Sequence, residues 1–384
     1  MRLDWLRPVL EREGPFVTAC LDASRDDPAG AHEVELRWAG HAERLAAMGA
    51  PQEALTAAGE AAVRPTGRSG KLGRLVVATK EGLALDIVLP EPPVREEAVF
   101  GPVPDLLPAV RAAGGAVYAV VDLDRKGADV EIVGVLGEAV DREQVEGDHD
   151  LLHKVPGGGW SQRRYQARVE DSWDHNAHTV ARALNVLASE YRPQVIVVRG
   201  DDKAAAALAE HIAPKVRERV VRVHGGGRGA GADDSTGRGE VAQVLAAHAE
   251  KARAAVADRF REAEGRQDVA VQGLDAVLDT LRRGQVEELL LRDDPTSPLQ
   301  LWVGRAPGAV AQRRSELEAM GEQHPERVRA GAALVWAVLS TDAGMTLVGD
   351  EAPVAEGVAA LLRWSDRSTP HDAVPSMPGH GRRP

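Results

Sequence analysis

Cysteine is nearly absent from this chain of 384 residues, which contains only Cys20. A single cysteine excludes an intrachain disulfide and most cysteine-based metal sites. Cys20 lies in the apolar run 16–21, so we predict a buried structural thiol rather than a reactive one. The sequence therefore gives no indication of redox chemistry, and we expect neither a metal nor a cofactor.

Aromatic residues are also scarce, at 3% of the chain, although 43% of the residues are hydrophobic. The cores must therefore be built largely from Ala, Val and Leu. The length suggests two or three domains rather than one large core. Against so few aromatic residues, each tryptophan stands out.

Long hydrophobic runs are missing. No apolar stretch approaches the roughly 20 residues that span a bilayer, and the N-terminus lacks the apolar core of a signal peptide. We therefore expect a soluble, cytoplasmic protein with no membrane partner. The net charge of −12 argues against a protein that coats nucleic acid through its whole surface. DNA is accordingly not an expected partner.

One segment, residues 153–173, reverses this acidic balance. Between Leu151 and Val169 the charged residues are Lys154, Arg163, Arg164 and Arg168, with no Asp or Glu. Three consecutive glycines precede these arginines and allow another molecule to approach the backbone closely. Arginines bind phosphate, and aromatic rings stack on RNA bases. Two interpretations follow: an RNA-contacting loop, or a glycine-rich surface loop followed by a helix with a basic first turn.

The first domain is predicted to cover residues 1–110, because prolines and glycines at 90–108 interrupt regular structure. Its expected elements are a strand at 16–22, a helix at 31–48, and a hairpin of strands at 74–79 and 84–89. This pattern indicates a small α/β domain.

The second domain is predicted at 115–265, where strands alternate with helices and indicate a layered α/β domain. Its expected elements are a hairpin of strands at 116–122 and 129–134, a helix at 172–191, a buried strand at 194–199, a helix ending at Ile212, and a long helix at 240–264. The glycine-rich stretch 224–239 lacks the Gly-Lys-Ser/Thr ending of a phosphate-binding P-loop, so we predict a flexible loop there.

The third domain is predicted at 268–364. Its expected elements are a helix carrying the stripe Leu274, Val277, Leu278 and Leu281, a strand at 286–291, a buried helix at 332–339, a strand at 345–348 and an apolar element at 357–364. The polar, Pro- and Gly-rich residues 365–384 show no periodicity and predict a disordered tail.

Three sequence motifs, in this order, resemble motifs of one known superfamily. Residues 158–165 read Gly-Gly-Trp-Ser-Gln-Arg-Arg-Tyr, where release factors carry Gly-Gly-Gln-Ser followed by Arg-Phe and another Arg. Residues 273–291 are similar to the helix–strand opening of the superfamily's third domain, and residues 357–364 to its closing Gly-Ile-x-Ala-x-Leu-Arg-Tyr. Over about 115–364, the chain thus resembles the bacterial branch of the archaeo-eukaryotic class-1 release factor and Pelota superfamily. The resemblance implies a three-domain α/β architecture with a divergent N-terminal domain.

The sequence departs from release factors at the residue that supports hydrolysis. In release factors the Gln after the two glycines helps to place a hydrolytic water, whereas Trp160 occupies that position here. An indole offers one donor and no acceptor, so it cannot replace an amide in orienting water. We therefore predict no catalytic residue and no peptide release. The N-terminal domain also lacks the Asn-Ile-Lys-Ser and Tyr-x-Cys-x-x-x-Phe elements that read stop codons, so stop-codon decoding is not expected.

The resemblance implies a role like that of Balon-type ribosome hibernation factors, which occupy the ribosomal A site, extend a loop toward the peptidyl-transferase centre, and can do so with elongation factor Tu bound. The residues predicted to bind rRNA are Lys154, Gly157, Gly158, Gly159, Trp160, Ser161, Gln162, Arg163, Arg164, Tyr165 and Arg168. Two alternatives stay open. One is a residual peptidyl-tRNA hydrolase that uses Gln162, two positions from the usual glutamine, and the other is a stress-linked binding protein that never meets a ribosome.

Other candidate chemistry finds less support in the sequence. Ser161 lacks the Gly-x-Ser-x-Gly elbow of a nucleophile because Arg163 occupies the position of the last glycine. Asp122 and Asp124 fit a turn at the end of a strand. The remaining polar groups are Asp148, His149, Asp150 and His153, and the helical pair His175 and His178. Their spacing matches no known zinc pattern, so solvated histidines are favoured.

Overall fold

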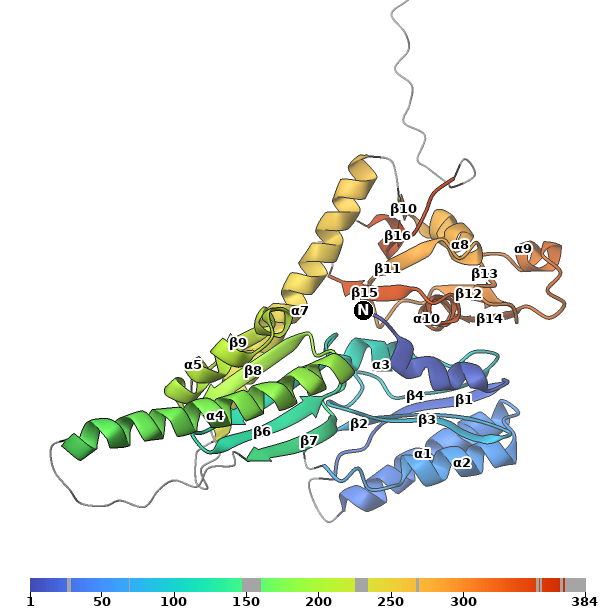
Figure 1. Ribbon diagram of the computed structural model, residues 1–384. Helices are drawn as coiled ribbons and strands as arrows, with labels where there is room; N and C mark the ends of the chain where they lie inside the picture. The colour runs from blue at the N-terminus through green and yellow to red at the C-terminus, as the bar shows by residue number, and fades with distance from the viewer. Residues whose placement is uncertain are drawn as a thin grey trace, which may run out of the picture. The chain divides into compact units, whose positions relative to one another are not determined.

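The computed structural model describes residues 1–25, 29–68, 70–146, 160–224, 234–266, 269–349, 352, 354–366 and 369; within 160–173 and 234–236 only the backbone is described. Its helices and strands confirm the mixed α/β fold (Figure 1). The chain forms two compact units, the first from Met1–Ala112 together with Arg253–Pro384 and the second from Ala113–Ala252. The division into three domains stays a prediction.

The N-terminal part of the first unit is an antiparallel sheet in the order β3-β2-β1-β4. Its elements are β1 (Phe16–Asp22), β2 (Gly73–Thr79), β3 (Gly82–Leu89), β4 (Glu97–Gly101), α1 (Gly30–Ala47) and α2 (Gln52–Ala62). Alternate residues of β1, among them Val17 and Leu21, face α1 and α2 and form an apolar core with Val34 and Leu45. The predicted strand, helix and hairpin are confirmed, whereas α2 was not predicted.

Strand β4 lies inside the proline-rich stretch that predicted a domain boundary at 90–108. It pairs with β1 from Phe16↔Gly101 to Cys20↔Glu97, so the first sheet continues to Gly101. The prolines flank β4 rather than interrupt it, and β4 is an edge strand, where proline is best tolerated. The boundary between the compact units follows Ala112.

On the other side of this sheet, η1 (Asp4–Glu11) and α3 (Leu107–Ala112) contact β3 and α10 (Ala330–Ser340). Phe16 meets Trp336 of α10 with ring centroids 5.7 Å apart. Cys20 is also buried here, and burial raises the pKa of its thiol to about 12. A thiol that resists ionisation is a poor nucleophile, which agrees with the predicted structural role.

The C-terminal part of the first unit is a sheet in the order β10-β16-β11-β15, in which only β11 and β15 run parallel to each other. The elements of this part are β10 (Ala270–Gln272), α8 (Leu274–Arg282), β11 (Val286–Arg292), β12 (Gln300–Val303), β13 (Val310–Ala311), α9 (Arg314–Ala319), β14 (Glu326–Arg329), α10, β15 (Gly344–Val348), η2 (Ala355–Gly357) and β16 (Val358–Leu362). The predicted helices and strands are confirmed. The small sheet β13-β12-β14 was not predicted. Residues 370–384 of the predicted tail lie outside the described residues, whereas Thr369 is buried.

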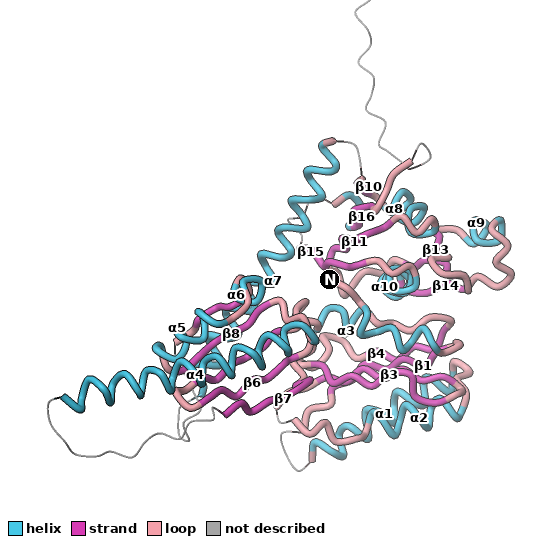
Figure 2. The backbone as a smooth tube through the Cα atoms, in the orientation of Figure 1, coloured by secondary structure: helices cyan, strands magenta, loops and turns pink. Residues whose placement is uncertain are grey.

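The second unit is a five-stranded sheet in the order β7-β6-β5-β8-β9, in which β5, β8 and β9 run parallel. Its elements are β5 (Tyr118–Leu123), β6 (Gly127–Val133), β7 (Ala139–Glu146), α4 (Trp160–Glu190), β8 (Val195–Gly200), α5 (Asp202–His211), α6 (Pro214–Arg217), β9 (Val220–Arg222) and the part of α7 (Asp234–Gly265) that ends at Ala252. Helices α4 and α5 cover one face of the sheet, and α7 packs Val241 against the other (Figure 2). None of the described helices combines the length and apolarity needed to cross a membrane.

Two helices of this unit begin earlier than predicted. Helix α4 starts at Trp160 rather than near Ser172, and α7 starts at Asp234 rather than at Glu240. Residues 234–239 of the predicted 224–239 loop are therefore helical, while residues 225–233 lie outside the described residues. Both early segments are polar or glycine-containing, so they carry no apolar periodicity from which a helix start could be predicted.

Gly200 provides a test of how closely β8 approaches β5. Its φ is +110°, and a Cβ atom at this position would lie 1.9 Å from the carbonyl oxygen of Leu123. We expect Gly200→Ala to destabilise the protein by roughly 3 kcal/mol or more, because backbone strain adds to a clash with backbone that cannot move aside.

Gly137→Ala is the matched control, because Gly137 has a φ of +74° but nothing within 4 Å of its Cβ position. It should cost only about 1 kcal/mol of backbone strain. Urea unfolding of both variants measures the difference. Equal losses of unfolding free energy in the two variants would show that the contact with the Leu123 carbonyl does not contribute to the cost at Gly200.

Candidate nucleic-acid interface

The basic segment predicted from the sequence opens α4. Trp160 is the first residue of the helix, and Ser161, Gln162, Arg163, Arg164, Tyr165 and Arg168 follow within its first turns. Only the backbone is described at these positions. Lys154, Gly157, Gly158 and Gly159 lie outside the described residues. The structure thus places seven of the predicted residues on one continuous helix.

The C-terminal half of α4 anchors the helix to its sheet. Val180, Leu184 and Leu187 are buried in one core with residues of β5, β6, β8 and α5. Two polar contacts add to this packing: the Asn176 side-chain amide donates to the Arg125 carbonyl (3.0 Å), and the Asn185 side-chain oxygen accepts from the Ala213 N–H (3.1 Å). The first turns of α4 extend beyond the strands of their own sheet (Figure 1).

The start of α4 has the electrostatics of an anion site. A helix N-terminus carries a partial positive charge and free N–H groups. The first turn of α4 contains no acidic residue, and the chain places Arg163, Arg164 and Arg168 in the turns that follow. Dipole and side-chain charges therefore have the same sign there, and a polyanion such as an RNA backbone would offset both.

Several other polar groups noted in the sequence have structural partners. The Asp124 carboxylate accepts from the N–H groups of Lys126 (2.7 Å) and Gly127 (2.9 Å), which closes the β5–β6 turn as predicted. Asp122 forms an ion pair with Arg199 at 2.5 Å. Among the described residues, no three His, Cys, Asp or Glu side chains gather where they could hold a metal ion. His178 contacts His211 edge to face, while Asp148, His149, Asp150 and His153 lie outside the described residues.

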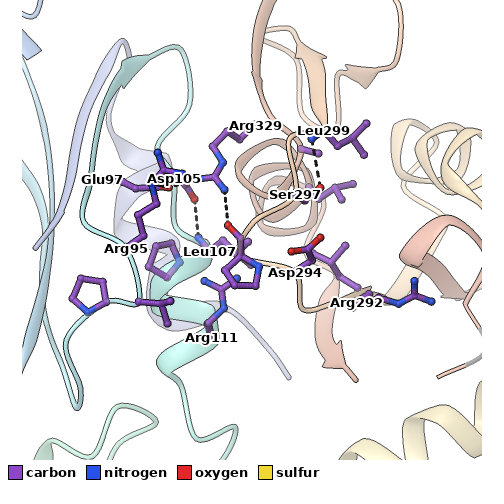
Figure 3. A pocket seen from close by; sticks show the side chains of 18 of the residues that line it. Arg95, Glu97, Asp105, Leu107, Arg111, Arg292, Asp294, Ser297, Leu299 and Arg329 are labelled. Carbon is purple, nitrogen blue, oxygen red and sulfur yellow. Dashed lines mark hydrogen bonds and ion pairs between the residues drawn. The ribbon is translucent and has the colours of Figure 1, made fainter. Parts of the chain in front are cut away.

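The first unit contains a cavity of about 480 Å³ that the sequence did not predict. One wall comes from the proline-rich segment before β4 and from α3, and the opposite wall from β11, β14 and α10 (Figure 3). The charged side chains that line it are Glu91, Arg95, Glu97, Asp105, Arg111, Arg292, Asp294, Arg329 and Glu356. These residues are far apart in sequence, so no local pattern could have revealed them together.

The charges around the cavity largely pair with one another or with its immediate rim. The Arg329 guanidinium contacts the Glu97 carboxylate and donates to the Pro295 carbonyl at 3.1 Å. Arg111 forms an ion pair with Asp293 at 2.7 Å. Asp105 is 8% exposed and accepts from the Leu107 N–H at 3.2 Å. These charge pairs therefore join the two parts of the first unit. The lining of the cavity presents no excess charge of one sign that would attract a nucleic acid.

Comparison with known proteins supports the resemblance over the middle of the chain. Residues 117–266 match the family model described as bacterial archaeo-eukaryotic release factor family 2. Two uncharacterized proteins from two strains of Mycobacterium tuberculosis are each 28% identical to this chain, over 95% of its length and 97% of theirs. The resemblance to release factors is therefore supported for the segment that carries α4.

Several solved structures are also similar to the chain. They include the archaeal translation termination factor aRF1 (16% identity, 94% of this chain and 96% of that one, TM-score 0.24) and the Saccharomyces cerevisiae termination-like factor Dom34 (12% identity, 78% and 81%, TM-score 0.37). A third is a ribosome-bound archaeal Pelota (15% identity, 94% and 93%, TM-score 0.34). At these TM-scores the likenesses support no conclusion about this chain.

The buried carboxyl group of Asp105 makes the cavity sensitive to pH. Burial raises its pKa, the nearby Glu97 raises it further, and the Leu107 N–H, Arg329 and Arg111 lower it. In the window from the unfolded-state pKa up to the raised folded-state value, the folded protein binds more protons, so stability falls as the pH rises. Asp105→Asn keeps an oxygen acceptor for Leu107 but cannot ionise. We expect this variant to melt at a higher temperature than the wild type at pH 7, and this advantage should vanish below about pH 3.8.

Glu91→Gln is the control, because Glu91 lines the same cavity but is exposed. It should leave the melting temperature nearly unchanged at both pH values. Calorimetry across pH 3–8 tests the difference. If Asp105→Asn still raised the melting temperature below about pH 3.8, ionisation of Asp105 could not be the cause of the stabilisation.

Proposed function

We propose that this protein binds the ribosome, occupies its A site and does not release the nascent peptide, in a cytoplasmic role in ribosome hibernation or stress protection. One observation carries the proposal: the segment that matches a bacterial release factor family contains the helix that opens with Trp160 and three arginines. A release factor must present this part of the chain to ribosomal RNA.

The proposed contact is between the start of α4 and rRNA of the peptidyl-transferase centre. The anchored half of α4 fixes the direction of the helix, and its first turns extend beyond the sheet that holds it. Guanidiniums at the positions of Arg163, Arg164 and Arg168 can bind phosphate, and the rings of Trp160 and Tyr165 can stack on bases for about 1–3 kcal/mol each. The glycines that precede them would let RNA approach the backbone closely.

The absence of peptide release follows from the chemistry of one side chain. Orienting a water molecule for attack needs a hydrogen-bond acceptor, and the Trp160 indole can only donate. Elongation factor Tu is included in the proposal as a delivery partner, on the resemblance to Balon-type factors alone.

Binding through the start of α4 can be tested by removing its charge. We expect Arg163→Ala/Arg164→Ala/Arg168→Ala to weaken binding to ribosomes by at least about tenfold, because each charge-assisted contact with phosphate contributes roughly 1.5–3 kcal/mol. Gly158→Ala/Gly159→Ala should weaken binding through the backbone. Co-sedimentation with purified ribosomes measures both effects.

Arg182→Ala, at an exposed arginine in the anchored half of the same helix, is the matched control. If all the variants sediment like the wild type, the start of α4 is not the ribosome-binding site.

The lack of hydrolytic activity has a separate test. Ribosomes loaded with peptidyl-tRNA should show no release above background when the protein is added, because Trp160 cannot position water. Trp160→Gln restores the amide of the release factor motif and serves as the matched variant.

Release by the wild-type protein would instead favour a peptidyl-tRNA hydrolase that uses Gln162. Failure to bind ribosomes from starved cells would favour a binding protein that acts elsewhere.

A further inference from the structure

The sheet of the second unit carries opposite charge at its two edges. Strands β6 and β7 form one edge of the sheet, and β8 and β9 the other. The charged residues of the β6–β7 edge are Asp129, Glu131, Glu138, Asp141, Glu143 and Glu146, opposed only by Arg142. Those of residues 192–224 at the β8–β9 edge are Arg192, Arg199, Lys203, Lys215, Arg217, Arg219 and Arg222, opposed by Asp201, Asp202, Glu210 and Glu218.

Four of these cations form what we call the basic edge: Arg192, Lys215, Arg217 and Arg219. β8 and β9 are adjacent parallel strands, so their N-terminal ends meet at the same margin of the sheet. Arg192 precedes β8, Arg219 precedes β9, and α6 brings Lys215 and Arg217 to the same margin. The Arg219 guanidinium donates to the Pro193 carbonyl at 3.1 Å, which joins the two strand ends directly.

The basic edge keeps its charge because its arginines are held by neutral groups. Arg217 donates to the carbonyls of Glu210 (3.2 Å) and Ile212 (3.3 Å), and Arg219 to that of Pro193. Carbonyls fix a guanidinium without cancelling its charge. None of the four cations forms an ion pair with a described residue, whereas Arg199 and Arg222 pair with Asp122 and Asp202. The nearby carboxylates of Glu190, Glu210 and Glu218 are exposed and reduce the field without forming an ion pair with these cations. Asp141 of β7 lies beside Tyr191, so it also reduces the field at Arg192.

Arg192 also has a strained backbone conformation. Its φ is +50°, the left-handed conformation that glycine usually supplies just after a helix, and Arg192 stands just after α4. For any residue other than glycine, this conformation costs about 1–2 kcal/mol of stability. The side chain at this position is therefore held at a cost in stability that glycine would avoid.

We propose that the basic edge is a second RNA-binding surface of this protein and contacts backbone phosphates of structured RNA. The inference rests on the proposed function, which names ribosomal RNA as the polyanion. Guanidiniums held in a fixed geometry match phosphate oxygens and need little ordering on binding. The acidic β6–β7 edge repels the same backbone, so the unit binds with its β9 side toward the RNA. Two separated contacts, the basic edge and the start of α4, would fix the orientation of the unit on the RNA.

The experiment compares the salt dependence of ribosome binding in three proteins: the wild type, Arg192→Gly/Lys215→Gln, and Asp141→Asn/Glu143→Gln/Glu146→Gln at the acidic edge. The first variant removes two cations whose side chains form no hydrogen bond or ion pair with any described residue, and it relieves the strain at position 192. Its melting temperature should therefore equal or exceed that of the wild type. Its binding should weaken by about tenfold, and the slope of log affinity against log salt should fall by about one for each lost phosphate contact. The acidic-edge variant should bind as tightly as the wild type or more tightly.

A short RNA duplex is titrated in parallel, so that the two proposals can fail separately. If the wild type binds ribosomes and the basic-edge variant shows an unchanged slope, the second surface is refuted and the proposed function stands. If the wild type binds the duplex but not ribosomes, and only the basic-edge variant loses the duplex, the surface is supported and the proposed function fails. Binding to neither RNA refutes both.

Discussion

The packing of one half of α4 against the sheet of the second unit is the interaction on which the candidate interface depends. Leu184 and Leu187 are buried between β5, β6, β8 and α5, so the C-terminal half of the helix cannot pivot without exposing apolar surface. The 31 residues of α4 span roughly 46 Å at 1.5 Å per residue, and an α-helix is stiff over such a length. The burial of a few apolar side chains at one end therefore fixes the direction in which Trp160 and the arginines are presented at the other.

The sequence revealed those features that leave a local signal. Apolar periodicity correctly predicted α1, α8, α10 and the buried strands β1, β5, β8 and β11, because each buries a stripe or a whole face of side chains. The start of α4 was missed, because its polar and basic residues bury nothing that could impose a period. β12, β13 and β14 are only two to four residues long and leave too short a pattern. The cavity depends on pairs such as Arg329 with Glu97, which are 232 positions apart, and no single sequence shows such a pairing.

The candidate interface combines features that suit RNA binding with side chains that do not suit hydrolysis. Binding to RNA requires positive charge, free N–H groups and stacking surfaces, and all three accompany the opening of α4. Hydrolysis requires in addition one group that can orient water. Under the proposed function, Trp160 supplies a stacking surface but no acceptor for water, so one side chain separates the capacity to bind from the capacity to react. The same reasoning explains why the charge-balanced cavity of the first unit is a poorer candidate: Arg329 and Arg111 already hold Glu97 and Asp293.

The acidic balance of the whole chain strengthens this interpretation. A uniformly basic protein binds any RNA, whereas a chain of net charge −12 is repelled by polyanions except where cations are concentrated and unpaired. The sheet of the second unit shows how this is arranged, because its carboxylates gather on β6 and β7 and its carbonyl-held arginines gather beside β8 and β9. Repulsion from one edge and attraction at the other give the unit a preferred orientation before any contact forms. Specificity for a folded RNA can then come from the spacing between the start of α4 and the basic edge. Only an RNA whose phosphates match that spacing can bind to both positive sites at once.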